Sequence, residues 1–236
     1  ATVDPQSSTN LDPPIAIGAF VVGTLILSWV ISFVLITDTV PVYTTLLLML
    51  TPATVALVIR RARGHSVLRT VSSSLRGSTG RSLLFAVGFP VGFLGIAALL
   101  ALTTGLGTYQ PGPENILVIA LRQGGVVLLA LFLLQSLIRM YGEEFGWRGY
   151  LLPELTARWN RVRATAAVGV VWALFHSAFL YRAGVAIGVE NPLLITVVQA
   201  IAVFTISFPF SYAYFLTDGS VFPVMILHLI WNILNP

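Results

Sequence analysis

The chain has no cysteine and no lysine, and only nine of its 236 residues are acidic. The lack of cysteine excludes disulfide bonds and thiolate metal sites. Charged residues make up 9% of the chain, whereas a soluble domain averages about 25%. All thirteen basic residues are arginine, but a nucleic-acid-binding protein would place them as a patch on a soluble fold. The composition therefore predicts no nucleic-acid partner.

Hydrophobic residues make up 56% of the chain, and the mean hydropathy is +0.89. These values predict an all-α, polytopic membrane protein in a lipid bilayer, with about seven transmembrane helices of roughly 20 residues each. We expect residues 1–12 to be a disordered lead-in and residues 13–236 to form a single transmembrane domain. The expected spans are 14–37, 42–59, 82–104, a fourth from about Asn115, 164–180, 192–216 and 221–234.

Arginine clusters predict the topology. The segment from Arg60 to Arg81 holds six arginines and no acid, and a second cluster comprises Arg158, Arg161 and Arg163. The positive-inside rule places both clusters in the cytoplasm. Two spans separate them, so the two signals agree. We expect the N-terminus and these loops to be cytoplasmic, the C-terminus to lie outside, and the first cluster to be a solvated loop near anionic headgroups.

Glu143 and Glu144 are adjacent in one of the most apolar parts of the chain. Carboxylates in a low-dielectric medium are expensive, so such a pair predicts a functional polar site; the alternative is a pair in water at a helix end. His176 and His228 lie inside the fifth and seventh expected spans. A lone intramembrane histidine often serves only as a hydrogen bond between helices. Two histidines near an acidic pair favour a site.

Helical spacing assigns the side chains to faces. His228 and Asn232 are four residues apart and share a face. Glu144 and Arg148 have the same spacing, with the acid first, which favours an ion pair. Glu143 is rotated by about 100° from Glu144, so we expect Arg148 to neutralise Glu144 and leave Glu143 for the site. For Glu143 to lie within the membrane, the fourth helix has to continue through Leu152. We then expect a cavity open to the cytoplasm.

These motifs resemble those of the CPBP family of intramembrane proteases, which includes CAAX prenyl endopeptidases and the Abi, or bacteriocin-immunity, proteins. The matching patterns are Glu143-Glu144-x-x-x-Arg148, an aromatic-x-x-x-His ending at His176, and His228-x-x-x-Asn232. The resemblance covers about residues 126–235, with a family-like core of about 115–236 formed by the last four helices around an intramembrane polar site. The second motif usually begins with phenylalanine, and here Trp172 takes that place.

The resemblance implies hydrolysis of a peptide bond in a membrane-associated peptide or protein. A buried glutamate is a competent general base for water, and we assign that role to Glu143, with His176 holding the water. His228 and Asn232 are expected to bind the oxyanion. Glu144, Arg148 and Trp172 are supporting residues. A prenylated tail, a peptide precursor and another membrane protein are all substrates that the resemblance allows.

Two further questions stay open from the sequence. A zinc ion on Glu143, His176 and His228 is the competing mechanism, although no His-Glu-x-x-His motif exists; we expect no obligatory cofactor. The competing functions are a non-catalytic bacteriocin-immunity or partner-binding protein, and a proton-coupled transporter with glutamate and histidine as relays. No pair of matching broken helices indicates the inverted repeats of a transporter.

Overall fold

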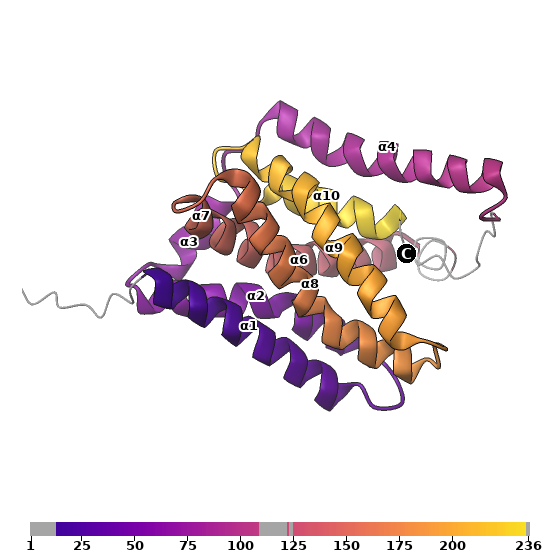
Figure 1. Ribbon diagram of the computed structural model, residues 1–236. Helices are drawn as coiled ribbons and strands as arrows, with labels where there is room; N and C mark the ends of the chain where they lie inside the picture. Colours follow the sequence, from indigo (N-terminus) through magenta and orange to yellow (C-terminus); the bar gives the residue numbers. More distant parts are fainter. Residues whose placement is uncertain (1–12, 109–121, 123–124, 235–236) are drawn as a thin grey trace, which may run out of the picture.

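The computed structural model describes residues 13–108, 122 and 125–234. Within these ranges every regular element is a helix (Figure 1). The elements are α1 (Pro13–Leu35), α2 (Val42–Ala62), α3 (Val67–Ser74), α4 (Gly80–Thr104), α6 (Gly125–Glu144), the π-helix η1 (Phe145–Leu151), α7 (Leu152–Thr156), α8 (Arg161–Ala186), α9 (Pro192–Phe215) and α10 (Phe222–Leu234). The expected lead-in and the expected start of the fourth span near Asn115 lie outside the described residues.

Six helical segments in the described ranges are long and apolar enough to cross a membrane. They confirm the prediction of an all-α, multi-pass integral membrane protein. The seventh expected span is the helix α10, which has 13 residues. At about 1.5 Å per residue it is roughly 20 Å long, shorter than the roughly 30 Å hydrocarbon core. Of its two polar motif residues, His228 is buried in the bundle, whereas Asn232, in the last turn, is exposed.

Several helix ends follow sequence signals. Thr79 and Ser82 form a reciprocal capping box at the start of α4. The side chain of Asn160 accepts a hydrogen bond from the Arg163 backbone and caps α8. Asn191 caps α9 in the same way, with Pro192 at the first helical position. Polar residues thus fix the starts of α4, α8 and α9.

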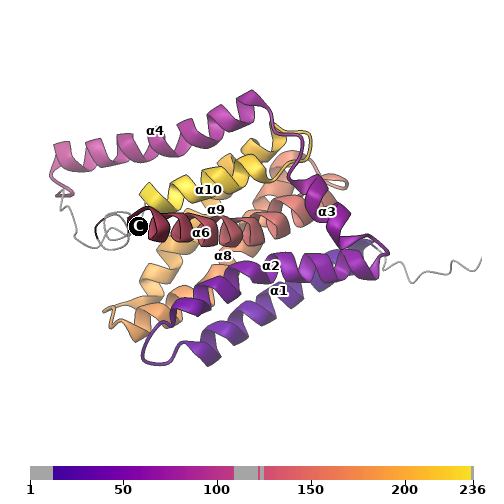
Figure 2. The same ribbon diagram turned by 180° about the vertical axis from the view of Figure 1, so that it is seen from behind.

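The arginine-rich connections gather at one end of the bundle. The two views show α3, α7 and the turn between α9 and α10 at the same end as the start of α1 (Figures 1 and 2). The start of α2, the end of α8 and the end of α10 lie toward the opposite end. Helix α8 packs along α9 and α1, whereas α10 packs against α4 and α6. The end that faces the cytoplasm stays a prediction from the positive-inside rule.

The fourth span continues as predicted, but in a different helical form. α6 ends at Glu144, the π-helix η1 carries the chain to Leu151, and α7 follows without a break. The helix therefore passes Glu143 and Glu144 and reaches Leu152. A π-helix has a wider turn than an α-helix and is often found at functional sites. Sequence periodicity alone did not reveal this change in the helix next to the acidic pair.

Two glycines on this helix allow α2 to approach very closely. A Cβ atom on Gly142 would lie 2.5 Å from the backbone oxygen of Met49, and one on Gly146 would collide with Pro52. Gly142 and Gly146 form a Gly-x-x-x-Gly motif, which brings membrane helices into close contact. Glu143 and Glu144 lie between the two glycines in sequence. The contact therefore fixes α2 beside the helix that carries both carboxylates.

We expect Gly142→Ala and Gly146→Ala to lower the melting temperature of the purified protein by several degrees. The added methyl group has to displace backbone atoms of α2, and such overpacking destabilises a protein by about 1–3 kcal/mol. Gly88→Ala in α4 is the matched control, because a Cβ at Gly88 would meet nothing within 4 Å. Equal melting temperatures for all three variants would contradict the close approach.

The segment from Arg60 to Arg81 is more than the solvated loop that the sequence predicted. It contains the helix α3, and its side chains bond to the fourth span, among them the hydroxyl of Ser74 to that of Tyr141 at 3.0 Å. Arg60 donates to the backbone oxygen of Gly149 at 2.9 Å, and Arg63 pairs with Glu154 at 2.7 Å. The hydrogen bond with Glu154 raises the pKa of the Arg63 guanidinium above its ordinary value. These contacts anchor η1 and α7, a role that charge patterning did not distinguish from solvation.

Candidate active site

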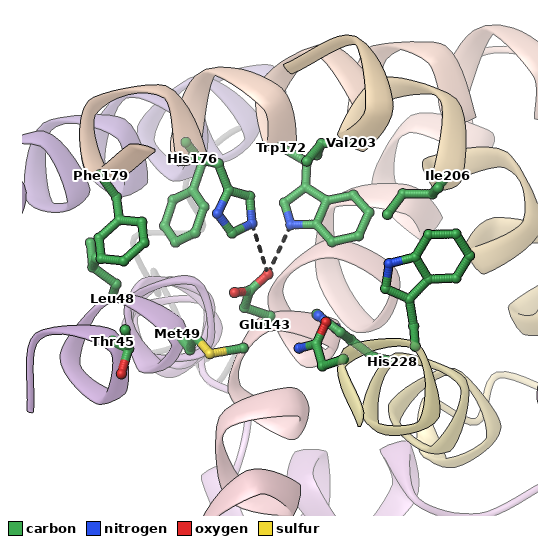
Figure 3. A pocket seen from close by; sticks show the side chains of 13 residues that line it. Thr45, Leu48, Met49, Glu143, Trp172, His176, Phe179, Val203, Ile206 and His228 are labelled. Carbon is green, nitrogen blue, oxygen red and sulfur yellow. Dashed lines mark hydrogen bonds and ion pairs between the residues drawn. The ribbon is translucent and has the colours of Figure 1, made fainter. Parts of the chain in front are cut away.

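A pocket with a volume of about 210 Å³ lies among α2, α8, α9 and α10 and the end of α6 (Figure 3). Glu143, His176, His228 and Asn232 all line it. The structure thus brings these four side chains to one pocket, and their catalytic roles stay predictions. Thr45, Leu48 and Met49 from α2 line the same pocket. The N-terminal half of the chain thus contributes a wall that the motifs of the last four helices did not predict.

Glu143 is fully buried, and its two oxygens have different surroundings. Oε2 accepts a hydrogen bond of 2.8 Å from the indole Nε1 of Trp172. The Nε2 atom of His176 lies 3.6 Å from the same oxygen, which is beyond a direct hydrogen bond. Oε1 has no hydrogen-bond partner among the described residues. Glu143 is thus held through one oxygen, while the other is a buried acceptor with no partner beside the pocket (Figure 3).

Glu144 has a separate set of partners. Its Oε2 accepts from the Nη1 of Arg148 at 2.9 Å, as the spacing predicted, and both side chains are fully buried. Its Oε1 lies 2.8 Å from the Nδ1 of His228, a contact that the sequence did not predict. The sequence analysis assigned His228 only to binding of the oxyanion. Here Glu144 fixes the orientation of the ring, and no described residue bonds to the Nε2 atom of His228.

Aromatic rings enclose the buried guanidinium. Arg148 lies over the ring of Trp172 at 4.4 Å and over that of Phe210 at 5.1 Å. Its Nη2 also donates to the Oγ of Ser207 at 3.3 Å. Cation–π contacts strengthen when the cation is shielded from water. Glu144, Arg148 and the rings around them therefore form a fixed base for the pocket on its arginine-rich side.

The pocket extends away from the arginine-rich end of the bundle. Thr45 lies in the first turn of α2, Phe179 lies one turn beyond His176, and Asn232 lies in the last turn of α10. On the other side of Glu143, Trp147 and Arg148 are fully buried. The expected cavity open to the cytoplasm differs from this arrangement, because bulky side chains of η1 fill the arginine-rich side.

The geometry does not assemble the three zinc ligands of the competing mechanism, Glu143, His176 and His228. Within the described ranges no three His, Cys, Asp or Glu side chains converge as a metal-binding group. His228 turns its Nδ1 to Glu144, and Trp172 donates to the oxygen of Glu143 that is nearest to His176. A catalytic zinc ion needs three protein ligands at about 2.0–2.2 Å. The residues in this arrangement do not fit that set.

The comparison with known families gives a second line of observation. Residues 125–234 match the Rce1-like family of type II CAAX prenyl endopeptidases. Over this part, slightly less than half of its length, the chain is similar to that family. No protein with a curated description matches the chain. The matched segment begins at the first residue of α6 and ends at the last residue of α10.

The departure from the family pattern at Trp172 has a structural consequence. Trp172 is buried, and its indole N–H bonds to Glu143. The phenylalanine that usually begins this motif has no such donor. From the sequence, the only expected effect of tryptophan in place of phenylalanine was a narrower cavity, because the indole ring is larger. In this structure the ring also holds the carboxylate of Glu143 through that hydrogen bond.

Some site residues had signals in the sequence that could have revealed them. The Gly-x-x-x-Gly motif around the acidic pair indicates a helix contact, although not that the partner is α2. Met140, one turn before Glu144, accepts from the amide of Asn232 at 3.4 Å. Ser207 and Phe210 carry no distinguishing pattern within the apolar helix α9. Only the packing of the helices brings them to Arg148.

Proposed function

We propose that this protein is an intramembrane CAAX-type endopeptidase in which Glu143 activates water to cleave a peptide bond of a membrane-associated substrate. The family match supports the class of reaction. The observation that carries the assignment of the base is the carboxylate of Glu143, buried and held through Oε2, with Oε1 unbonded among the described residues. A buried carboxylate kept near a reacting water is suited to general base catalysis.

In the proposed reaction, the Oε1 atom of Glu143 removes a proton from a water molecule. The water oxygen then attacks the carbonyl carbon of the scissile bond, and the proton passes from Glu143 to the leaving amine as the C–N bond breaks. His176 lies on the pocket wall beside Glu143 and is proposed to position the water. The products are a new carboxylate and a new amine, and no cofactor changes its oxidation state.

The developing oxyanion requires hydrogen-bond donors on the opposite wall of the pocket. The Nδ2 amide of Asn232 is one proposed donor. Its only hydrogen bond among the described residues is to the sulfur of Met140, which is a weak acceptor. The Nε2 of His228 is the other. Glu144 accepts from Nδ1, so Nε2 donates only in the doubly protonated form of the ring. Glu144 and Arg148 hold His228 and do not contact the substrate.

The proposed mechanism, which uses no metal ion, can be tested with a chelator. We expect dialysis against a chelator to leave the cleavage rate unchanged, because Glu143 and His176 are placed to act on water without a metal ion. The measurement is peptide cleavage by the purified, chelator-treated protein, with metal content determined on the same sample. Loss of activity that zinc alone restores would contradict this proposal.

We expect Trp172→Phe to reduce the cleavage rate by about tenfold while the protein stays folded. The change restores the usual family residue but removes a hydrogen bond to a charged group, which contributes about 1.5–3 kcal/mol. Cleavage rates and melting temperatures of the purified variants provide the measurement. Trp159→Phe, the same substitution at an exposed tryptophan away from the pocket, is the control. A Trp172→Phe enzyme with unchanged rate would show that the indole does not orient Glu143.

The proposed function as a whole is tested by quantifying cleaved protein termini in cells. The comparison is between cells with the wild-type protein and cells with His176→Ala, at equal expression. A protease produces new termini that depend on His176. A partner-binding or immunity protein leaves the two sets of termini the same, and that result would contradict the proposal.

A further inference from the structure

Arg139 is a cation within the membrane span α6 that forms no direct ion pair among the described residues, and the acid that acts on its charge is Glu143, one turn further on. Among the residues that the structure describes, no carboxylate lies within ion-pair distance of its guanidinium. Its two hydrogen bonds, to Thr45 at 3.4 Å and to Ser136 at 3.3 Å, are both long. Its Nε atom is buried without a partner in the same set of residues. An arginine in this position is costly unless it has a functional partner.

The position of Arg139 relates it directly to the pocket. It precedes Glu143 by one helical turn and therefore lies on the same face of α6. Its partner Thr45 lines the pocket, on the far side of Met49 from Glu143 (Figure 3). Helix side chains lean toward the N-terminus, so its guanidinium is carried away from Glu143. Arg139 itself does not line the pocket, but it is half-buried and bonds to Thr45 on the pocket wall, so its guanidinium lies next to the end of the pocket beyond Met49.

We infer that Arg139 binds the free C-terminal carboxylate of the substrate and so sets how far from the chain end the cut is made. This inference rests on the proposed peptidase function. The free carboxylate of a chain end that enters a membrane pocket needs a cation to replace its lost hydration. Arginine binds carboxylates through two parallel hydrogen bonds. Of the cations in the described residues, Arg148 is already paired with Glu144.

The spacing agrees with removal of a short C-terminal fragment. One helical turn between Arg139 and Glu143 corresponds to about 6 Å, and the lean of the arginine side chain adds to that separation. An extended peptide advances about 3.3–3.6 Å per residue. A carboxylate on Arg139 therefore places the bond next to Glu143 two to three residues from the chain end. If Arg139 had only a structural role, the position of the cut would not depend on the distance between Arg139 and Glu143.

The test measures binding without requiring cleavage. Two fluorescent farnesylated CAAX peptides, identical except for a C-terminal acid or amide, are titrated against Glu143→Gln and against the double variant Glu143→Gln/Arg139→Gln. We expect Glu143→Gln to bind the acid about 10- to 100-fold more tightly than the amide, the range of a hydrogen-bonded charge. The double variant is expected to bind both alike. Arg139→Lys, which keeps the charge but not the fork, is expected to retain part of the preference.

Arg69→Gln, a change at an exposed arginine of α3, is the matched control and should keep the full preference. Equal binding of acid and amide by Glu143→Gln would overturn the carboxylate assignment and leave the proposed protease intact. If the double variant still binds the acid more tightly than the amide, a group other than Arg139 binds the carboxylate of the peptide. Failure of both peptides to bind any variant would overturn the CAAX substrate class, and the inference with it.

Discussion

Glu143→Gln is expected to lower the rate of peptide cleavage by about 10²–10⁴-fold, the contribution of a general base. Glutamine has the same shape, and its carbonyl oxygen can still accept the hydrogen bond that Trp172 donates to Glu143. It cannot take a proton from water. No arginine forms a direct ion pair with Glu143 in the described ranges, so removal of its charge breaks no buried arginine–carboxylate pair. We therefore expect a folded protein that binds substrate with little turnover.

The measurement is kcat for a CAAX-type peptide with purified protein, together with the melting temperature of each variant. A scaffold or immunity protein would function normally with glutamine at this position. A Glu143→Gln protein that cleaves at the wild-type rate would contradict the assignment of the base. A variant that fails to fold would contradict the separation of Glu143 from the ion pair that supports the site.

Glu144→Gln is expected to have the opposite effect, a large loss of stability. The carboxylate of Glu144 is the ion-pair partner of buried Arg148 and a partner of His228. Removing one partner of a buried ion pair destabilises a protein by about 3–5 kcal/mol, because the other charge stays buried. For a chain of this size the melting temperature should fall by roughly 6–20 °C. The measurement is thermal unfolding in detergent.

A second change separates loss of the pair from other effects of glutamine at position 144. Replacing Arg148 by methionine in the Glu144→Gln background removes the unpaired cation, and part of the lost stability should return. Glu143→Gln is the matched control, since it is the same substitution at the adjacent residue. If Glu144→Gln were as stable as the wild type and Glu143→Gln were not, the two glutamates would have the reverse roles.

The sequence predicted the interactions that occur within one helix. The ion pair of Glu144 with Arg148 and the shared face of His228 and Asn232 both follow from the helical repeat. Continuation of the fourth helix through Leu152 followed from the need to keep Glu143 within the bilayer. These inferences need only local geometry and the chemistry of the solvent. The single transmembrane domain over residues 13–236 and the orientation in the membrane stay predictions.

Contacts between helices were less accessible from the sequence. The hydrogen bond from Trp172 to Glu143 joins residues 29 positions apart in the chain, and that between His228 and Glu144 joins residues 84 positions apart. Each bond connects two different helices. Hydropathy fixes which residues enter the membrane but not which helices meet there. The close approach of α2 depends on two glycines whose effect appears only once a partner backbone is known. The wall formed by Thr45 and Met49 was missed for that reason.

The most direct test of the central claim is single-turnover cleavage in water enriched in ¹⁸O, with the enzyme in excess over a farnesylated CAAX peptide. If Glu143 activates water, the newly formed carboxylate of the product carries one ¹⁸O atom in the first turnover, as mass spectrometry of the product would show. An unlabelled product would mean that the oxygen comes from a protein side chain, and failure to cleave any such peptide would remove the substrate class. Either result would contradict the account.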